Sequence, residues 1–407
     1  MKRKLRGLLL LPLITLSGLP GALLAQHETD AGRQTRLEDL GRALFFDVSL
    51  SRDRTQSCAT CHDPARAFTD WRDSGVSAAA SLGNDLHSLG DRNAPTASYA
   101  SLIPPFGKNQ AGEYAGGLFW DGRANSLEEQ AGGPPMNPIE MGMTDKSGVI
   151  ERLQENANYL HEFTRLFGQE VFSDQDLAYQ AMTMAIAAFE RSGFFAPFDS
   201  RYDRYLQGQY TPTEEEALGM TLFFSNQFTN CNKCHQLQSI PESANETFSN
   251  YSYQNIGVPV NRQLRQANNS PADRIDQGLL EHPGVSDPEA SGKFRVPGLR
   301  NVAITAPYMH NGVFRDLRTV IMFYNKYLTR GARAQINPET GEPWDEPEVN
   351  TSLALEKLQA GRVLDERGID ALVAFMRMLT DRRYEALLEP VGSETAGSET
   401  AGATAVP

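Results

Sequence analysis

Two short motifs each place two thiols beside an imidazole. The first reads C-A-T-C-H at residues 58–62, and the second reads C-N-K-C-H at residues 231–235. In such a motif the two thiols can add across the vinyl groups of a haem, and the adjacent histidine can ligate its iron. The chain has 4 cysteines, all of them in these motifs, so none remains for a disulfide. We predict two covalent c-type haems, held by Cys58, Cys61, His62, Cys231, Cys234 and His235.

A single motif of this kind also fits a redox dithiol or a zinc knuckle. A zinc site would bring the two cysteine pairs together as Cys₄ or Cys₂His₂, and it would not require export from the cell. Two complete copies with no other cysteine favour haem.

The N-terminus has the pattern of a secretory signal peptide. Basic residues crowd positions 2–6, an apolar stretch interrupted by Pro and Gly fills positions 7–25, and small residues end it near Ala22 and Ala25. No later stretch is long and apolar enough to span a bilayer. Because such haem attachment in bacteria occurs outside the cytoplasmic membrane, we expect residues 1–25 to be removed and the mature protein to be periplasmic.

The chain is acidic. The expected signal peptide carries four basic residues and no acidic one, so its removal takes the formal charge from −13 to −17. A protein this acidic is a poor nucleic-acid binder. The charge would suit a basic electron donor, although acidity is also a common means of staying soluble.

The sequence repeats itself before each haem motif. L-G-R-A-L-F-F fills residues 40–46 and L-G-M-T-L-F-F fills residues 218–224, both with apolar side chains at helical spacing. Before the second run, Thr211 followed by Pro212 and Glu214 predicts a capped helix start. Further helices are expected at 174–191, with Ser173 as N-cap, and at 368–379.

This organisation predicts a mainly α fold with two cytochrome c-like haem domains packed together and joined by long loops, above all residues 75–148. We assign residues 1–25 to a signal peptide, 26–205 to an N-terminal haem domain and 206–390 to a C-terminal haem domain. The small polar repeats of residues 391–407 predict a disordered tail.

The segments beside the haem motifs resemble the bacterial di-haem cytochrome c peroxidase family, which includes MauG. The matching stretches are L-F-W-D-G-R at 118–123, L-E-E-Q at 127–130, Pro134, P-I-E-M-G at 138–142, F-R-V-P-G-L-R-N at 294–301 and T-A-P-Y-M-H-N-G at 305–312. The resemblance runs from about residue 37 to residue 379, with both haem motifs in register.

The resemblance implies a peroxidatic haem on His62 and an electron-transfer haem on His235. It implies that Glu140 takes a proton from bound peroxide and returns it to the leaving oxygen, as a carboxyl with an adjusted pKa can do. Gln130 corresponds to an amide that hydrogen-bonds the bound oxygen, and Pro134 to a residue that crowds this face. Without the resemblance, Glu140 would be taken for a surface helix cap.

Two more family features are implied between the haems. Trp120 corresponds to a tryptophan that shortens electron transfer, although it could simply fill a core. Asn93, Thr305 and Pro307 correspond to the ligands of a structural calcium, one amide and two backbone carbonyl oxygens, which suit a hard cation. An ordinary turn before Pro95 would also explain Asn93.

Two positions depart from the peroxidase pattern. The peroxidases have a methionine ligand fourteen residues after the histidine of the P-Y-x-H motif, and Tyr324 occupies that position here, as a tyrosine does in MauG. A phenolate is a harder, anionic ligand that lowers the reduction potential; Met322 is two residues away on another helix face. The peroxidases also carry a distal histidine, for which His87 is the sole candidate, as a ligand or as a solvated loop residue.

These features favour a periplasmic enzyme that uses hydrogen peroxide at the His62 haem. Through Trp120 and a His235/Tyr324-ligated haem, it would oxidise an external substrate in the MauG manner, which could be a protein. The alternative is a reductively activated peroxidase fed by a small cytochrome c or cupredoxin. A non-catalytic di-haem electron carrier is the alternative from another functional class. The sequence leaves a homodimer open.

Overall fold

The structure is a computed structural model that describes residues 29–238 and 241–388, so the expected signal peptide and the tail at 391–407 lie outside the described residues. The α-helices are α1 (Asp30–Phe45), α2 (Cys58–Cys61), α3 (Leu127–Ala131), α4 (Lys146–Gln154), α5 (Ala157–Phe167), α6 (Gln175–Glu190), α7 (Arg201–Leu206), α8 (Glu214–Phe224), α9 (Arg262–Ala267), α10 (Leu317–Asn325), α11 (Leu355–Leu358) and α12 (Glu366–Met378). The strands are β1 (Gly107–Lys108), β2 (Tyr114–Ala115), β3 (Tyr253–Gln254) and β4 (Phe294–Arg295).

Helices and loops therefore make up almost the whole described chain, and the predicted mainly α class is confirmed. The strands form only two short antiparallel pairs, β1 with β2 and β3 with β4. No helix among residues 29–238 and 241–388 is both long and apolar enough to cross a membrane.

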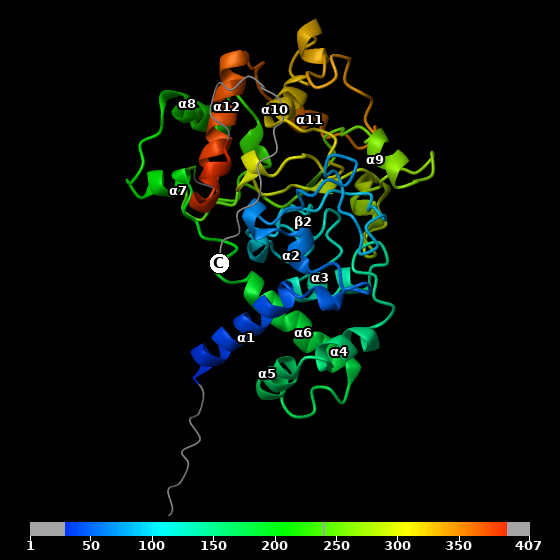
Figure 1. Ribbon diagram of the computed structural model, residues 1–407. Coiled ribbons are helices and arrows are strands. Elements are labelled where there is room, and N and C mark those ends of the chain that lie inside the picture. The colour runs from blue at the N-terminus through cyan, green and yellow to red at the C-terminus, as the bar shows by residue number, and fades with distance from the viewer. Residues whose placement is uncertain (1–28, 239–240, 389–407) are drawn as a thin grey trace, which may run out of the picture.

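The repeated L-G-x-x-L-F-F run builds the same helix crossing twice. Gly41 of α1 touches α6 so closely that an added Cβ would lie 1.8 Å from the backbone O of Ala185. Gly219 of α8 touches α12 in the same way, with 1.8 Å to the backbone O of Ala371. The absent side chain is what lets each helix pair touch backbone to backbone. Figure 1 shows the α1–α6 and α8–α12 pairs toward opposite ends of the molecule, with loops and short helices between them.

Two of the predicted helix starts are shifted. The N-cap of α6 is Asp174 and not Ser173, because the Asp174 carboxylate accepts from two backbone N–H groups of the first turn. The cap of α8 is Thr213 and not Thr211, with Glu216 completing the capping box over 2.9 Å to the Thr213 N. In both cases a second side chain of capping type, one or two residues further on, had better access to the free N–H groups.

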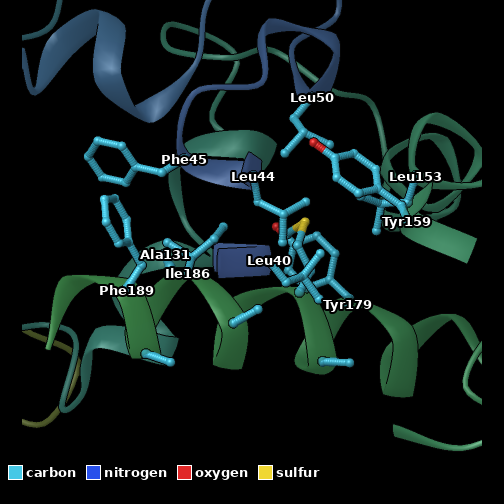
Figure 2. Close-up of a cluster of buried hydrophobic side chains, with 14 of the residues drawn as sticks. Leu40, Leu44, Phe45, Leu50, Ala131, Leu153, Tyr159, Tyr179, Ile186 and Phe189 are labelled. Carbon is cyan, nitrogen blue, oxygen red and sulfur yellow. The ribbon is translucent and has the colours of Figure 1, made fainter. Parts of the chain in front are cut away.

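Each helix pair carries its own hydrophobic core. The first core surrounds α1 and α6, and Figure 2 shows Phe45 of α1 facing Phe189 of α6, with a ring-centroid distance of 5.6 Å. The second core surrounds α8 and α12, where Phe223 and Phe375 meet at 5.0 Å. The domain boundaries stay a prediction, although the two cores fall on either side of residue 200.

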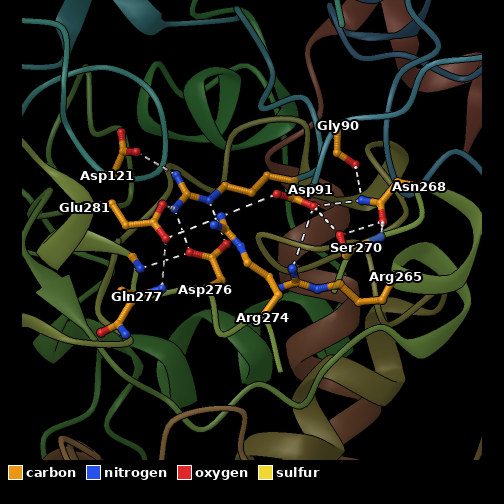
Figure 3. Close-up of polar contacts among 12 residues, drawn as sticks. Gly90, Asp91, Asp121, Arg265, Asn268, Ser270, Arg274, Asp276, Gln277 and Glu281 are labelled. Carbon is orange, nitrogen blue, oxygen red and sulfur yellow. Dashed lines mark hydrogen bonds and ion pairs between the residues drawn. The ribbon is translucent and has the colours of Figure 1, made fainter. Parts of the chain in front are cut away.

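A buried cluster of charges ties the two haem-motif halves together. The Arg92 guanidinium lies 2.7 Å from Asp121, 2.6 Å from Asp276 and 2.9 Å from Glu281. Figure 3 shows this cluster continuing to Asp91, which contacts Arg274 and Arg265. Because Arg92 and Asp276 are almost 200 residues apart in the sequence, the ion pairs fix the loop at residues 75–148 against the C-terminal half.

Candidate active site

Two cavities open beside the two C-x-x-C-H motifs. The first has a volume of about 470 Å³ and is lined by Cys58, Cys61 and His62. The second has a volume of about 200 Å³ and is lined by Cys231, Cys234 and His235. Both thiols of each motif therefore face one cavity together with the adjacent histidine, as haem attachment requires.

The two histidines are oriented in the same way. The Nδ1 atom of His62 lies 3.1 Å from the carbonyl O of Phe68, and Nδ1 of His235 lies 3.2 Å from the carbonyl O of Phe248. Both phenylalanines adopt positive φ angles, 57° and 58°, which turn the carbonyls toward the rings. Burial lowers the pKa of both imidazoles, to about 4 for His235. A neutral ring with Nδ1–H donated leaves the Nε2 lone pair free for a metal.

One cation in the wall of both cavities has no anion beside it. Arg295 is 5% exposed, and no carboxylate of the described residues lies within ion-pair distance of it. Its side chain donates a hydrogen bond from Nε to the carbonyl O of Phe119 over 3.3 Å. By contrast, the equally buried Arg300 binds both oxygens of Asp203. An unpaired buried guanidinium is costly, so Arg295 fits a group that brings carboxylates into these cavities, as haem does with its propionates.

The residues expected to act on peroxide meet over the first cavity. Gln130 comes from the last turn of α3, Pro134 opens the 3₁₀ turn η4 (Pro134–Met136), and Glu140 follows that turn. All three line the cavity that Cys58, Cys61 and His62 also line. Helix α3 packs against α6, which positions Gln130 at the cavity.

Asn84 fixes the loop that carries Glu140 through two hydrogen bonds. The backbone N and the side-chain Nδ2 of Asn84 both donate to the carbonyl O of Glu140, over 2.7 and 3.1 Å. Burial raises the pKa of the Glu140 carboxyl, and the Arg123 charge and the Asn137 amide oppose this only in part. A carboxyl whose pKa is shifted in this direction gives up its proton less readily, which suits a proton shuttle.

Trp120 lies in the wall between the two cavities. It is 9% exposed, and it lines both of them, as does Arg295. A tight turn presents it: Leu118 N donates to Ala124 O over 2.7 Å, and Gly117 approaches Gly122 so closely that an added Cβ would lie 2.4 Å from its O. The indole Nε1 donates to the carbonyl O of Asn93, which fixes the plane of the ring.

The second cavity contains Tyr324 and not Met322. Tyr324 projects from α10 into the cavity wall near Cys231 and Cys234. Burial raises the pKa of its phenol, so only a positive charge such as iron would draw off its proton. The Met322 sulfur lies outside this wall, 3.2 Å from the Arg318 guanidinium.

His87 does not reach the first cavity. It is exposed, its backbone N donates to Asp85, and it is absent from the cavity lining. The structure thus gives no support to the expectation that His87 ligates iron, because the loop after the first motif turns this side chain toward solvent.

The three expected calcium ligands share a third cavity of about 120 Å³, lined by Asn93, Thr305 and Pro307 among others. The Asn93 amide nitrogen donates to Ala78 O at 3.2 Å, so its Oδ1 is free to face a cation. No group of three or more His, Cys, Asp or Glu side chains that could hold a metal occurs in the described part of the chain. A cation here would rest on amide and backbone oxygens, which suit calcium.

Three residues around the cavities were not assigned roles from the sequence: Asn84, Arg295 and Glu190. Arg295 belongs to a stretch quoted for the family resemblance, but only the fold shows that it lacks an anion. Glu190 had a usable signal, because it follows Ile186 by four residues and Met182 by eight and so continues the apolar face of α6. Asn84 had none, since its contact lies 56 residues away in the sequence.

The chain is similar in sequence and in structure to known di-haem peroxidases. The profile of a family described as di-haem cytochrome c peroxidase matches residues 35–211. The chain is 53% identical over 353 residues to the methylamine utilization protein MauG of Paracoccus denitrificans, covering 87% of this chain and 90% of that one. It is 30% identical to the cytochrome c551 peroxidase of Nitrosomonas europaea, with 80% of each chain covered. The crystal structure of the diheme peroxidase BthA from Burkholderia thailandensis superposes with a TM-score of 0.77 at 32% identity, covering 89% of this chain and 90% of that one.

Proposed function

Since this chain belongs to the di-haem cytochrome c peroxidase family, we propose that it is a MauG-like enzyme that uses hydrogen peroxide at the His62 cavity to oxidise an external protein. It is an oxidoreductase of that family, and its two motifs supply the attachment points for two c-type haems. When bound, these haems supply iron that exchanges electrons with peroxide and with the substrate.

The observation that carries the proposal is the asymmetry between the cavities. Glu140, Gln130 and Pro134 converge on the His62 cavity, and His87 stays away from it. On the side of His235, Tyr324 occupies the wall in place of a peroxide-handling set. A carrier of electrons alone would have no use for a proton-holding carboxyl on one side only.

The roles we propose follow from these positions. The Glu140 carboxyl takes a proton from one oxygen of peroxide and returns it to the other, which makes that oxygen a better leaving group. The Gln130 amide hydrogen-bonds the peroxide, and Pro134 limits the space around it. Trp120 would carry electrons across the wall between the cavities, and the Tyr324 phenolate oxygen would ligate the iron of a haem held in the second one.

Two further features belong to the same proposal. The Asn93 Oδ1 and the backbone oxygens of Thr305 and Pro307 hold one calcium ion, which braces the Trp120 wall because Asn93 also accepts the indole hydrogen bond. The protein works in the periplasm, as the N-terminal sequence pattern and covalent haem attachment both suggest.

The decisive experiment mixes the fully oxidised holoprotein with hydrogen peroxide in a stopped-flow spectrometer. We expect a reaction without prior reduction and spectral changes at both haems. A reaction that begins only after one electron is added would instead identify a reductively activated peroxidase that draws electrons from a small cytochrome c or cupredoxin. Two low-spin haems and no reaction in either state would identify an electron carrier.

A further inference from the structure

Glu190 is a buried carboxyl of the first cavity that the proposed function leaves unused. It ends α6, is 6% exposed and lines the first cavity. Its Oε2 atom is buried and has no hydrogen-bond partner among the described residues. Buried polar atoms are almost always hydrogen-bonded, and an exception in a cavity wall calls for an explanation.

The two halves of the molecule supply an internal comparison. Gly41 meets Ala185 and Phe189 of α6, and Gly219 meets Ala371 and Phe375 of α12. Because the two crossings have the same contacts, they show which residue of α6 corresponds to which residue of α12.

In that register Ile186 corresponds to Leu372, and Glu190 corresponds to Met376. Ile186 and Glu190 line the first cavity, and Leu372 and Met376 line the second. The same backbone position therefore faces both cavities. It carries a carboxyl only in the half that also carries Glu140.

The charges around Glu190 do not neutralise it. The charge of Arg191 favours ionised Glu190, but the Arg191 guanidinium pairs with Glu128 of α3 at 2.7 Å. Arg42 of α1 stacks on the Phe189 ring, 4.8 Å from its centroid. Cys58 of α2 is also a neighbour, because a charge on Glu190 would raise the pKa of its thiol. Once its sulfur is bound to haem as a thioether, Cys58 carries no charge.

We propose that Glu190 is a redox-linked proton site of the first haem cavity, holding a proton while the haem there is reduced and releasing it when that haem loses an electron. The inference rests on the proposed function only in taking this cavity to be a haem site. Loss of the electron adds one positive charge, and loss of the proton leaves one negative charge, so the charge of the cavity is unchanged. The electron passes to an external one-electron oxidant, such as the mediator of a redox titration, and the proton passes to solvent beside the Arg191–Glu128 pair, which is partly exposed.

The physical reason is the low dielectric of the cavity. An isolated carboxylate buried there is strongly disfavoured, and burial raises the pKa of Glu190 to about 8. A positive charge appearing in the same cavity stabilises the ionised form. By linkage, the reduction potential must then fall as pH rises through the interval between the two pKa values.

The test measures the reduction potentials of both haems in the holoprotein by spectroscopic titration at pH values on either side of 8. In the wild type the first-haem potential should fall with rising pH. Glu190→Gln and Glu190→Met should lose this slope and keep the potential that the wild type has at low pH, because both are neutral like the protonated acid. Met376→Glu should give the second haem a new pH dependence. An unchanged first-haem slope in Glu190→Gln overturns the proposal.

Glu140→Gln serves as the control, because it removes another carboxyl of the same cavity wall and should leave the slope in place. A slope that vanishes in Glu140→Gln and persists in Glu190→Gln would assign the proton to Glu140 and overturn the inference. All variants are first checked for two covalent haems.

Should the Glu190 variants fail to fold, the infrared difference spectrum of the Glu140→Gln protein decides the question. A protonated-carboxyl band should disappear on oxidation, and its absence overturns the proposal. Neither measurement uses peroxide, so a failure of the proposed function would leave the pH slope untouched.

Discussion

The indole Nε1 of Trp120 donates a hydrogen bond to the backbone O of Asn93 over 2.8 Å. Trp120 thus lines both haem cavities, and its hydrogen-bond partner Asn93 is a residue that we propose as a calcium ligand. The bond locks the ring in one orientation between the cavities, and any cation bound by the Asn93 side chain would stiffen the same segment. Electron exchange and calcium should therefore depend on each other.

The first prediction concerns this bond. Trp120→Phe keeps an aromatic ring but removes the N–H, which should cost about 0.5–1.5 kcal/mol of stability. Peroxide should still change the spectrum of the first haem, while the change at the second haem should become slower. Trp71→Phe is the control, because Trp71 is 56% exposed and lines neither cavity. Equal rates at the second haem in wild type and Trp120→Phe would remove Trp120 from the electron path.

The second prediction concerns the proton shuttle. Glu140→Gln should retain both haems but slow the reaction with peroxide by roughly 10²-fold or more, the usual cost of losing general acid–base catalysis. Stopped-flow rates should show this loss. Glu129→Gln, an exposed position of α3 outside the cavity wall, should react at the wild-type rate. If Glu140→Gln reacts as fast as Glu129→Gln, the proton moves through another group.

The sequence predicted the haem attachment motifs, the helical class and the repeated Gly41 and Gly219 runs because these depend on local spacing. It placed Gln130, Pro134 and Glu140 together through family resemblance, and the fold brings them to one cavity. It could not predict the missing anion beside Arg295 or the clamp of Asn84 on Glu140. Those depend on which distant segments meet, and a charge or an amide in one segment does not reveal its neighbours.

The third prediction concerns the second haem. Tyr324 has a raised pKa because it is buried, so its phenolate should form only with iron bound. The oxidised protein should show one high-spin and one low-spin haem. Tyr324→His should keep a six-coordinate second haem but lose the spectral change that peroxide causes at that haem. Tyr324→Phe should make the second haem high-spin.

Tyr327→Phe is the matched control, since Tyr327 lies three residues after Tyr324, does not line the second cavity, and donates its hydroxyl to Ile256 O. Its visible and electron paramagnetic resonance spectra should equal those of the wild type. A wild-type spectrum in Tyr324→Phe, with methionine-like bands in the red, would instead assign the ligand to Met322.

The fourth prediction concerns acid stability. Burial alone would raise the pKa of Asp276, but its ion pair with Arg92 outweighs this and holds the pKa well below the usual range. A carboxyl with a lowered folded-state pKa contributes stability that is present above its unfolded pKa, about 3.9, and is lost as pH falls below it. Asp276→Asn removes one of the three carboxylates that pair with Arg92, so it should lower stability by about 1–3 kcal/mol at neutral pH and by less at acid pH.

Urea unfolding at both pH values measures this difference. The exposed Arg52–Asp53 pair supplies the control, because Asp53→Asn should leave stability almost unchanged at either pH. A loss in Asp276→Asn that is independent of pH would show that the Arg92 contact stabilises through packing and not through charge.

The fifth prediction tests whether both halves depend on the same backbone contact. An alanine at Gly41 would place its Cβ 1.8 Å from the Ala185 O, and one at Gly219 would do the same to the Ala371 O. Each helix pair must separate to admit the methyl group, so each substitution should cost about 1–3 kcal/mol or more. Gly193→Ala is the control, since no atom lies within 4 Å of a Cβ there. Because α6 and α12 wall the two cavities, Gly41→Ala should disturb mainly the spectrum of the first haem and Gly219→Ala that of the second. Chemical denaturation and visible spectra measure both effects, and identical spectral changes in the two variants would refute the idea that each crossing serves its own haem.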